Sequence, residues 1–249
     1  MSSNLEIALF PCLSDNYGLL IHDRESGETA AIDTPEVSKI EAACAERGWT
    51  LTQIWNTHHH PDHTGGNLTL KEKRGVKITG PDQIKGRIPG LDDGVSGGDS
   101  FRFGAHEVQV IFTPGHTVDH IIYYVPNAKA AFVGDTIFVL GCGRLFEGSP
   151  EDMFGSMAAI AALPDDTRLY CAHEYTLSNA KFAVTVEPDN QALLDYVESA
   201  KNMREKGIPT VPTTVAMEKA TNPFMRAETV ARLGAVSYTH LTLPTNREV

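Results

Sequence analysis

The chain has 249 residues, of which 41% are hydrophobic and 21% are charged. These fractions are typical of a globular protein with a buried core and argue against disorder over most of the chain. Thirty-two acidic residues against 21 basic ones give a formal charge of −11 at pH 7, which would repel a nucleic-acid backbone. We therefore expect no nucleic-acid partner.

The sequence shows no segment that predicts a membrane or secreted protein. No apolar run approaches the ~18 residues of a membrane helix, and the first residues, MSSNLEIALF, do not read as a secretory signal. The four cysteines are widely spaced without a C-x-x-C pair, which argues against a zinc ribbon and a disulfide framework. We expect a cytoplasmic monomer that does not contact membranes.

Short aliphatic runs at the start of the chain predict consecutive strands of one sheet. These runs are IALFP (7–11), YGLLIHD (17–23) and TAAID (29–33). The following segment up to Gly48 predicts a helix capped by Asp33 or Thr34, with Pro35 in its first turn. QIWNT (53–57) then predicts a buried strand, and NLTLKEKRG (67–75) predicts a helix.

A second set of strands is predicted after residue 100, so the strands before and after that point can form two similar halves. The predicted strands are 100–116 with a turn near Gly104, 120–125, 129–135 and, after a helix at 149–163, 168–175. From about Leu177 the pattern changes. Residues 177–186 and 188–207 predict two consecutive helices, which would form a small helical appendage.

The segment THHHPDH places four histidines and one aspartate between a predicted strand and a predicted helix. In extended backbone, residues i and i+2 point the same way, so His58 and His60 can face one metal ion while His59 points elsewhere. Asp62 and His63 follow the turn, where they can serve a second ion. The segment therefore encodes four ligands for two sites.

Three further polar residues each follow an apolar strand: His116, Asp135 and His173. Polar residues at strand ends converge at one edge of a sheet, where α/β proteins build their sites. Each residue alone has an ordinary interpretation as a helix cap, a core histidine or a turn residue, but all seven together favour a metal centre. Five imidazoles and two carboxylates suit zinc, iron or manganese, and two ions about 3.5 to 4 Å apart would share a carboxylate and a water.

The motifs THHHPDH, TPGHT, VGDT and CAHEY together resemble those of the metallo-β-lactamase superfamily. GCGRLFEG and HEYTLSNAKF more specifically resemble its glyoxalase II branch, the hydroxyacylglutathione hydrolases, over roughly residues 5–235. The resemblance implies an α/β fold, an αββα metallo-β-lactamase sandwich with a small C-terminal helical domain. It divides the chain into a catalytic domain at 1–175, a truncated helical substrate-binding domain at 176–235 and a tail at 236–249 that we expect to be artefactual.

The resemblance also implies the metal ligands. The first ion would be held by His58, His60 and His116, the second by Asp62, His63 and His173, and Asp135 would bridge the two. Two divalent ions per chain are implied, with Zn²⁺ as the usual metal and Fe or Mn as alternatives. The catalytic residues would be Asp62 and Asp135, with Asp62 a ligand first and a proton-handling group second.

The implied activity is hydrolysis of a small-molecule glutathione thioester, S-D-lactoylglutathione, by a metal-bound hydroxide. This reaction is the second step of methylglyoxal detoxification. Arg144, Phe146 and Tyr175 would contact the substrate, although relatives often have tyrosine where this chain has Phe146. Because the tail lacks the family's basic pair, we expect reduced glutathione affinity.

Three alternatives remain open from the sequence. A persulfide dioxygenase would use one iron held by two histidines and an aspartate. An acyl-homoserine lactonase would keep the dinuclear site without a glutathione contact. A metal-binding module without catalytic activity would keep the full ligand set but turn over no acyl substrate.

Overall fold

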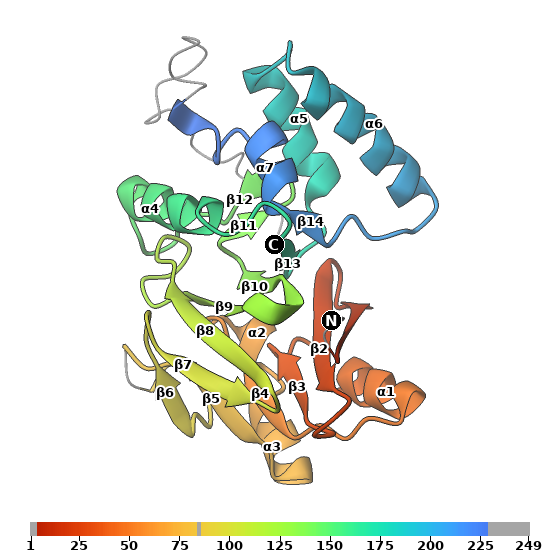
Figure 1. Ribbon diagram of the computed structural model, residues 1–249, viewed down its shortest axis with the longest axis vertical. Coiled ribbons are helices and arrows are strands. Elements are labelled where there is room, and N and C mark those ends of the chain that lie inside the picture. The colour runs from red at the N-terminus through yellow and green to blue at the C-terminus, as the bar shows by residue number, and fades with distance from the viewer. Residues whose placement is uncertain (1–3, 84–85, 229–249) are drawn as a thin grey trace.

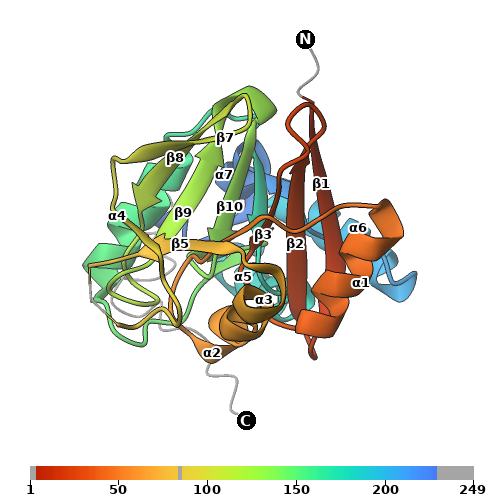
Figure 2. The ribbon, with the colours of Figure 1, turned by 90° about the horizontal axis from the view of Figure 1, so that it is seen from below.

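The computed structural model describes residues 4–83 and 86–228. Two six-stranded sheets pack face to face, and helices cover their outer faces (Figures 1 and 2). The first sheet uses only strands from before residue 100, and the second uses only strands from Ser100 onward. The expected αββα sandwich with C-terminal helices is therefore confirmed.

The first sheet is mixed. β1 pairs antiparallel with β2 and β2 with β3, whereas β3 to β6 run parallel. Its strands, in spatial order, are β1 (Leu5–Cys12), β2 (Asn16–Asp23), β3 (Thr29–Ile32), β4 (Gln53–Trp55), β5 (Lys77–Pro81) and β6 (Asp93–Val95). The connections between these strands contain the helices α1 (Val37–Arg47), α2 (Pro61–Thr64) and α3 (Asn67–Arg74).

The second sheet has the spatial order β14-β13-β10-β9-β8-β7. Its strands are β7 (Ser100–Phe103), β8 (His106–Phe112), β9 (Ile121–Val125), β10 (Ala130–Gly134), β13 (Arg168–Cys171) and β14 (Thr213–Thr214). A separate hairpin follows β10 and consists of β11 (Ile137–Phe138) and β12 (Gly141–Cys142). The helical elements are the short η1 (Pro126–Ala128), α4 (Pro150–Ala161), α5 (Thr176–Val186), α6 (Gln191–Glu205) and α7 (Val215–Thr221).

The inner strands of the first sheet, β2 to β5, bury both of their faces, each against a different layer. Successive side chains on a strand point to opposite faces. Leu19 and Ile21 of β2 therefore join the core between the sheets, whereas Leu20 joins a second core with Ile40 of α1. Trp55 of β4 is fully buried between the sheets. This burial on both faces explains why the strands read as continuous apolar runs.

The helices α5, α6 and α7 lie together at one end of the sandwich, at the top of Figure 1. The two helices predicted from residues 177–186 and 188–207 are present as α5 and α6, and Leu193, Val197 and Ala200 form the buried face of α6. The small helix α7 and the strand β14 were not predicted, because both are too short to show a periodic pattern.

The predicted start of the first helix was wrong. The helix α1 begins at Val37 after the N-cap residue Glu36, rather than after Asp33 or Thr34. Asp33 has a φ of 61°, in the left-handed region, and its buried carboxylate accepts hydrogen bonds from the backbone and hydroxyl of Thr57. The carboxylate of Asp33 therefore binds the loop after β4 and does not cap the helix.

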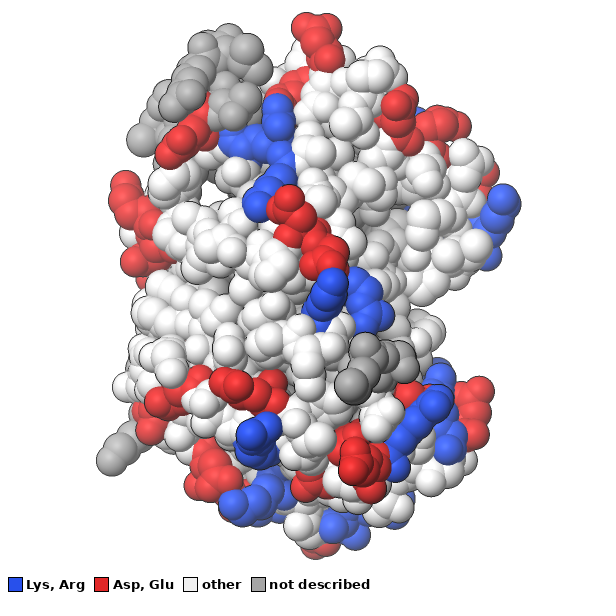
Figure 3. Space-filling view, viewed as in Figure 1, with Lys and Arg blue, Asp and Glu red and all other residues white. Residues whose placement is uncertain are grey.

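The surface carries charges of both signs. On the face shown in Figure 3, described Lys and Arg side chains alternate with Asp and Glu side chains. None of the helices in the described part of the chain is both long and apolar enough to span a bilayer. The segment 236–249, expected to be a tail unlike the family, lies outside the described residues.

Candidate metal centre

The first predicted ligand set comes together at one edge of the sandwich. Ring nitrogens of His58 and His60, from the loop after β4, and of His116, from the loop after β8, all lie within 4.8 Å of one another. The Nδ1 atom of His60 is 3.0 Å from the Nε2 atom of His116. The three imidazoles can therefore share one cation.

The second predicted set forms beside the first. Potential ligand atoms of Asp62, His63 and His173 also lie within 4.8 Å of one another. The Oδ2 atom of Asp62 is 3.4 Å from the Nε2 atom of His63 and 3.4 Å from that of His173. The helix α2 turns the chain after His60, so that Asp62 and His63 face a different point from the two preceding ligands.

Asp135 lies between the two sets, directly after β10. Its Oδ2 atom is 3.4 Å from the Nε2 atom of His116 and 3.5 Å from that of His173. Its Oδ1 atom is 3.4 Å from the Nε2 atom of His63. One carboxylate thus reaches ligands of both sets, as a bridging position requires.

The polar atoms at the centre fit a bound cation. The Nε2 atoms of His58 and His63 and the Oδ1 atom of Asp135 are buried without a hydrogen-bond partner among the described residues. A buried polar atom without a partner is costly, and such atoms call for a functional reason. Coordination of a divalent metal by these nitrogen and oxygen atoms would supply their missing partners.

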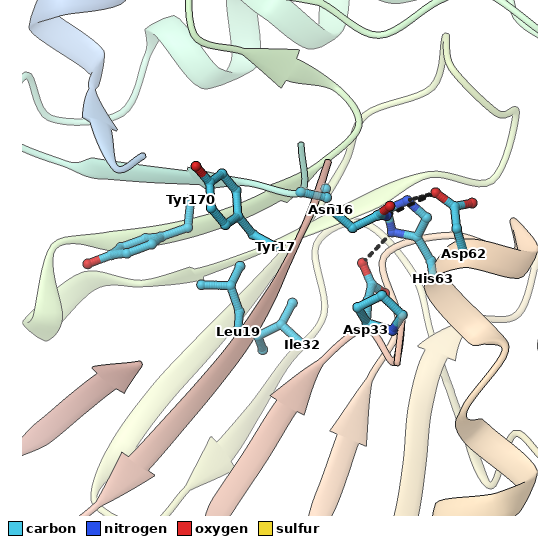
Figure 4. A pocket seen from close by; sticks show the side chains of 11 residues that line it. Asn16, Tyr17, Leu19, Ile32, Asp33, Asp62, His63 and Tyr170 are labelled. Atoms are coloured by element: carbon cyan, nitrogen blue, oxygen red, sulfur yellow. Dashed lines mark hydrogen bonds and ion pairs between the residues drawn. The ribbon is translucent and has the colours of Figure 1, made fainter. Parts of the chain in front are cut away.

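Three of the imidazoles are oriented by an outer partner on Nδ1, which turns Nε2 toward the centre. His63 donates to Asp33 Oδ2 over 2.8 Å, His173 to Asp15 Oδ1 over 2.7 Å and His116 to the carbonyl of Arg144 over 2.8 Å. Figure 4 shows His63 between Asp33 and Asp62.

The sequence analysis missed the two outer carboxylates, Asp33 and Asp15. Asp33 follows β3 directly, and Asp15 lies in the turn between β1 and β2. Their position at strand ends was the signal that could have found them, because polar residues at strand ends gather at one edge of a sheet.

The histidines of the site differ in the direction in which their surroundings shift the pKa. Burial alone would lower the pKa of His63, but the carboxylates of Asp135 and Asp33 raise it to about 10. By contrast, burial and the adjacent imidazoles lower the pKa of His58, and they lower that of His60 to about 4. A divalent cation at the second set would displace protons, so its affinity should fall as the pH falls.

A further group of potential ligands, His59, Asp119 and Glu147, lies outside the centre. The guanidinium of Arg87 donates to both oxygens of Glu147, over 2.7 and 2.8 Å. Asp119 Oδ1 lies 3.3 Å from Nδ1 of His59 and 3.8 Å from Arg87. A cation already occupies this cluster in the form of arginine, so we assign it no metal.

The candidate substrate residues line the same cavity as the ligands. This cavity has a volume of about 480 Å³, and its walls include His116, Asp135, Arg144, Phe146 and Tyr175. The ring of Tyr175 stacks on His173 with centroids 4.9 Å apart, and the guanidinium of Arg144 lies 5.1 Å from the ring centre of Phe146. Polar and aromatic groups therefore surround the opening beside the candidate metal ligands.

Comparison with known proteins identifies the family. Residues 31–173 match the sequence model of the metallo-β-lactamase superfamily, and residues 174–243 match that of the hydroxyacylglutathione hydrolase C-terminus. A protein of Maricaulis maris named hydroxyacylglutathione hydrolase is 54% identical over 235 residues, which are 93% of this chain and 92% of that protein. The chain belongs to the hydroxyacylglutathione hydrolase family.

A second curated relative supports the same family assignment. The hydroxyacylglutathione hydrolase of Brucella ovis is 56% identical over 226 residues, which are 91% of this chain and 88% of that protein. Among solved structures, that of ETHE1 from Myxococcus xanthus has a TM-score of 0.70 at 26% sequence identity and covers 96% of this chain and 92% of its own. The sandwich fold is therefore shared beyond the family.

Proposed function

We propose that the protein hydrolyses S-(2-hydroxyacyl)glutathione, with S-D-lactoylglutathione as its substrate, to a 2-hydroxy acid and glutathione. The observation that carries this proposal is the position of Asp135 between two sets of candidate ligands, in a cavity that Arg144 and Tyr175 also line. Identity above 50% with proteins named hydroxyacylglutathione hydrolase supports the same reaction. These relatives do not favour a persulfide dioxygenase or an acyl-homoserine lactonase.

We propose two divalent ions per chain, one held by each ligand set. Zinc suits these nitrogen and oxygen ligands, and iron or manganese would also fit them. When bound, such ions lower the pKa of a water from 15.7 to about 7 and polarise a carbonyl. This chemistry explains why the cavity needs no nucleophilic side chain.

The carboxylates of the site have two roles in this proposal. Asp135 spaces the two ligand sets, because its oxygens reach histidines of both. The contacts of Asp62 with Asn16, His63 and His173 all involve Oδ2. Its Oδ1 atom is left to accept the proton of the attacking water at the edge of the cavity.

We propose that Arg144, Phe146 and Tyr175 bind the glutathione part of the substrate. Arg144 supplies a positive charge for a carboxylate, and the exposed ring of Phe146 supplies apolar contact. The leaving group is the thiolate of glutathione, which is stable enough to leave with little protonation by an acid. The helical part, 176–235, would complete this side of the cavity, because Ser178 and Asn179 of α5 also line it. Residues 1–175 would supply the metal centre.

We further propose that the enzyme acts as a monomer in the cytoplasm. All four cysteines, Cys12, Cys44, Cys142 and Cys171, are buried free thiols, which suits a reducing compartment. Size-exclusion chromatography with light scattering would test the monomer, and a dimer mass would contradict it.

Hydrolysis assays would test the reaction. The purified metal-loaded chain should release glutathione from S-D-lactoylglutathione, and Asp62→Ala should reduce kcat/KM by at least about 100-fold. His59→Gln is a matched control in the same motif, outside both ligand sets, and should cost less than about tenfold. Turnover of an acyl-homoserine lactone, or oxygen uptake with glutathione persulfide, without thioester hydrolysis would contradict the proposal.

A further inference from the structure

The turn of the β11–β12 hairpin has an unfavourable backbone. Leu140, at its tip, has a φ of 61° and is fully buried. The left-handed region is uncommon for residues other than glycine and asparagine, and persists only where the surroundings hold it. Groups around the turn must therefore hold Leu140 in this conformation.

The surrounding groups come from the C-terminal helices. Asn222, just after α7, donates through Nδ2 to the carbonyls of Phe138 and Gly141, over 3.3 and 2.9 Å. The backbone N–H of Leu140 donates to Oε2 of Glu218 in α7 over 3.0 Å. Asn179 of α5 donates to the carbonyl of Val139 over 3.0 Å. Every residue of the turn thus has a backbone group bound by a side chain distant in sequence.

Glu218 is held firmly in this position. Its side chain is fully buried, Oε1 accepts a hydrogen bond from the hydroxyl of Thr213 over 2.7 Å, and Oε2 also accepts one from Asn222 over 2.9 Å. Losing a partner of a buried polar group costs more than the bond itself is worth. The carboxylate is therefore a fixed acceptor for Leu140.

The hairpin leads directly into the wall of the cavity. Phe138 lies edge-on to Tyr175 with ring centroids 5.1 Å apart. Past β12, a Cβ atom on Gly143 would come within 1.8 Å of the carbonyl oxygen of Asp135, so the chain passes tightly against the metal centre. The next residue, Arg144, accepts the hydrogen bond from His116 and lines the cavity. A shift of the turn would displace these groups together.

We propose that Glu218 and Asn222 are positioning residues for the substrate wall: they hold the turn 138–141 in its unfavourable conformation and so place Phe138 and the segment 144–146. Glu218 and Asn222 are not among the residues that line the cavity, and both bind the backbone of the hairpin, so both act through the hairpin. The choice of thioester as substrate, but not the positioning itself, rests on the function proposed above.

The experiment compares three variants of the full metal-loaded chain. Glu218→Ala removes the acceptor for Leu140, Glu218→Gln keeps one oxygen for it, and Thr213→Val removes a donor to Oε1, the oxygen that does not contact Leu140. We expect Glu218→Ala to raise KM for S-D-lactoylglutathione about tenfold while kcat changes less than about threefold. Glu218→Gln should restore KM, and Thr213→Val should leave KM unchanged even where it lowers Tm.

A second readout does not depend on turnover. Hydrogen exchange in the segment 137–146 should become faster in Glu218→Ala and stay at the wild-type rate in Glu218→Gln. Unchanged exchange in Glu218→Ala, or an equal rise of KM in Thr213→Val, would overturn the proposal. If Glu218→Ala does not fold, Glu218→Asp withdraws the carboxylate by one methylene and should change exchange and KM in the same direction. A wild-type chain that binds metal without cleaving the thioester would contradict only the proposed function.

Discussion

Nδ1 of His63 donates a 2.8 Å hydrogen bond to Oδ2 of Asp33, and both side chains are buried. This bond fixes the imidazole with Nε2 toward the metal centre. Such outer partners typically change metal affinity 10- to 100-fold. We therefore predict that Asp33→Asn lowers the affinity for divalent metal by about 10- to 100-fold, measured by competition with a chromophoric chelator.

The control for this prediction is Asp119→Asn. Asp119 is also a buried carboxylate beside a histidine, but its partner His59 is outside both ligand sets. We expect this variant to keep the wild-type metal affinity. Equal losses in the two variants would show that removing any buried carboxylate weakens the fold, and would contradict a specific role for Asp33.

A second prediction concerns the aromatic residue at the opening of the cavity. Phe146 is 57% exposed, and its ring lies edge-on to His116 at 5.3 Å. A hydroxyl on this ring would reach solvent and substrate without disturbing the core. Because one hydrogen bond contributes about 0.5 to 1.5 kcal/mol, Phe146→Tyr should lower KM for S-D-lactoylglutathione by about 2- to 10-fold, as steady-state kinetics would show.

Phe112→Tyr is the matched control, since Phe112 is also exposed but lines a different hollow, at the end of β8. Its KM should equal that of the wild type. A KM for Phe146→Tyr that stays unchanged or rises would indicate that the substrate does not pass over this ring.

A third prediction follows from the buried carboxyl of Glu218. Burial raises its pKa from 4.5 to about 7, and the titratable groups that face it, Cys171 of β13 and Tyr196 of α6, also have raised pKa values. The folded chain thus keeps a proton that the unfolded chain releases between pH 4.5 and 7. Its stabilising contribution is complete below about pH 4.5 and is lost, by about 3 kcal/mol, as the pH rises through 7.

Glu218→Gln cannot titrate, so this loss should disappear. The free energy of unfolding of the wild type, relative to Glu218→Gln, should fall by about 3 kcal/mol between pH 4.5 and 8, measured by urea denaturation at both pH values. A difference between the two proteins that is constant with pH would show that the buried carboxyl does not titrate in this range.

Much of the fold was predictable because it depends on local patterns. The strands β1, β2 and β3 have short aliphatic runs, and the helices α5 and α6 lie where the apolar spacing predicts them, although α6 covers only Gln191–Glu205 of the predicted segment 188–207. The hairpin β11–β12 and the helix α7 were missed. They are held by contacts such as Leu140 to Glu218, across 78 positions, which no local pattern reveals.

In the site, too, the residues that follow a local pattern could be predicted, whereas those that depend on distant contacts could not. The histidines of the 58–63 segment could be grouped from backbone periodicity. His116, Asp135 and His173 could be added because each follows a strand. The structure brings all of these residues together. Asp33 read instead as a helix cap, because its partner His63 is 30 positions away. Asp33 and Asp15, which orient ligands from outside the centre, carry no short motif. Their only local signal is a position next to a strand end, and the histidine that each one orients is identified only by the three-dimensional contacts.

Metal content per chain tests the central claim, a pair of cations joined by Asp135. The full chain should be saturated with zinc, dialysed and measured by elemental analysis, together with its hydrolysis of S-D-lactoylglutathione. We predict about two ions per wild-type chain, and at most one in Asp135→Ala with thioester hydrolysis lost. A single ion in the active wild type, or two ions and full activity in Asp135→Ala, would contradict the account.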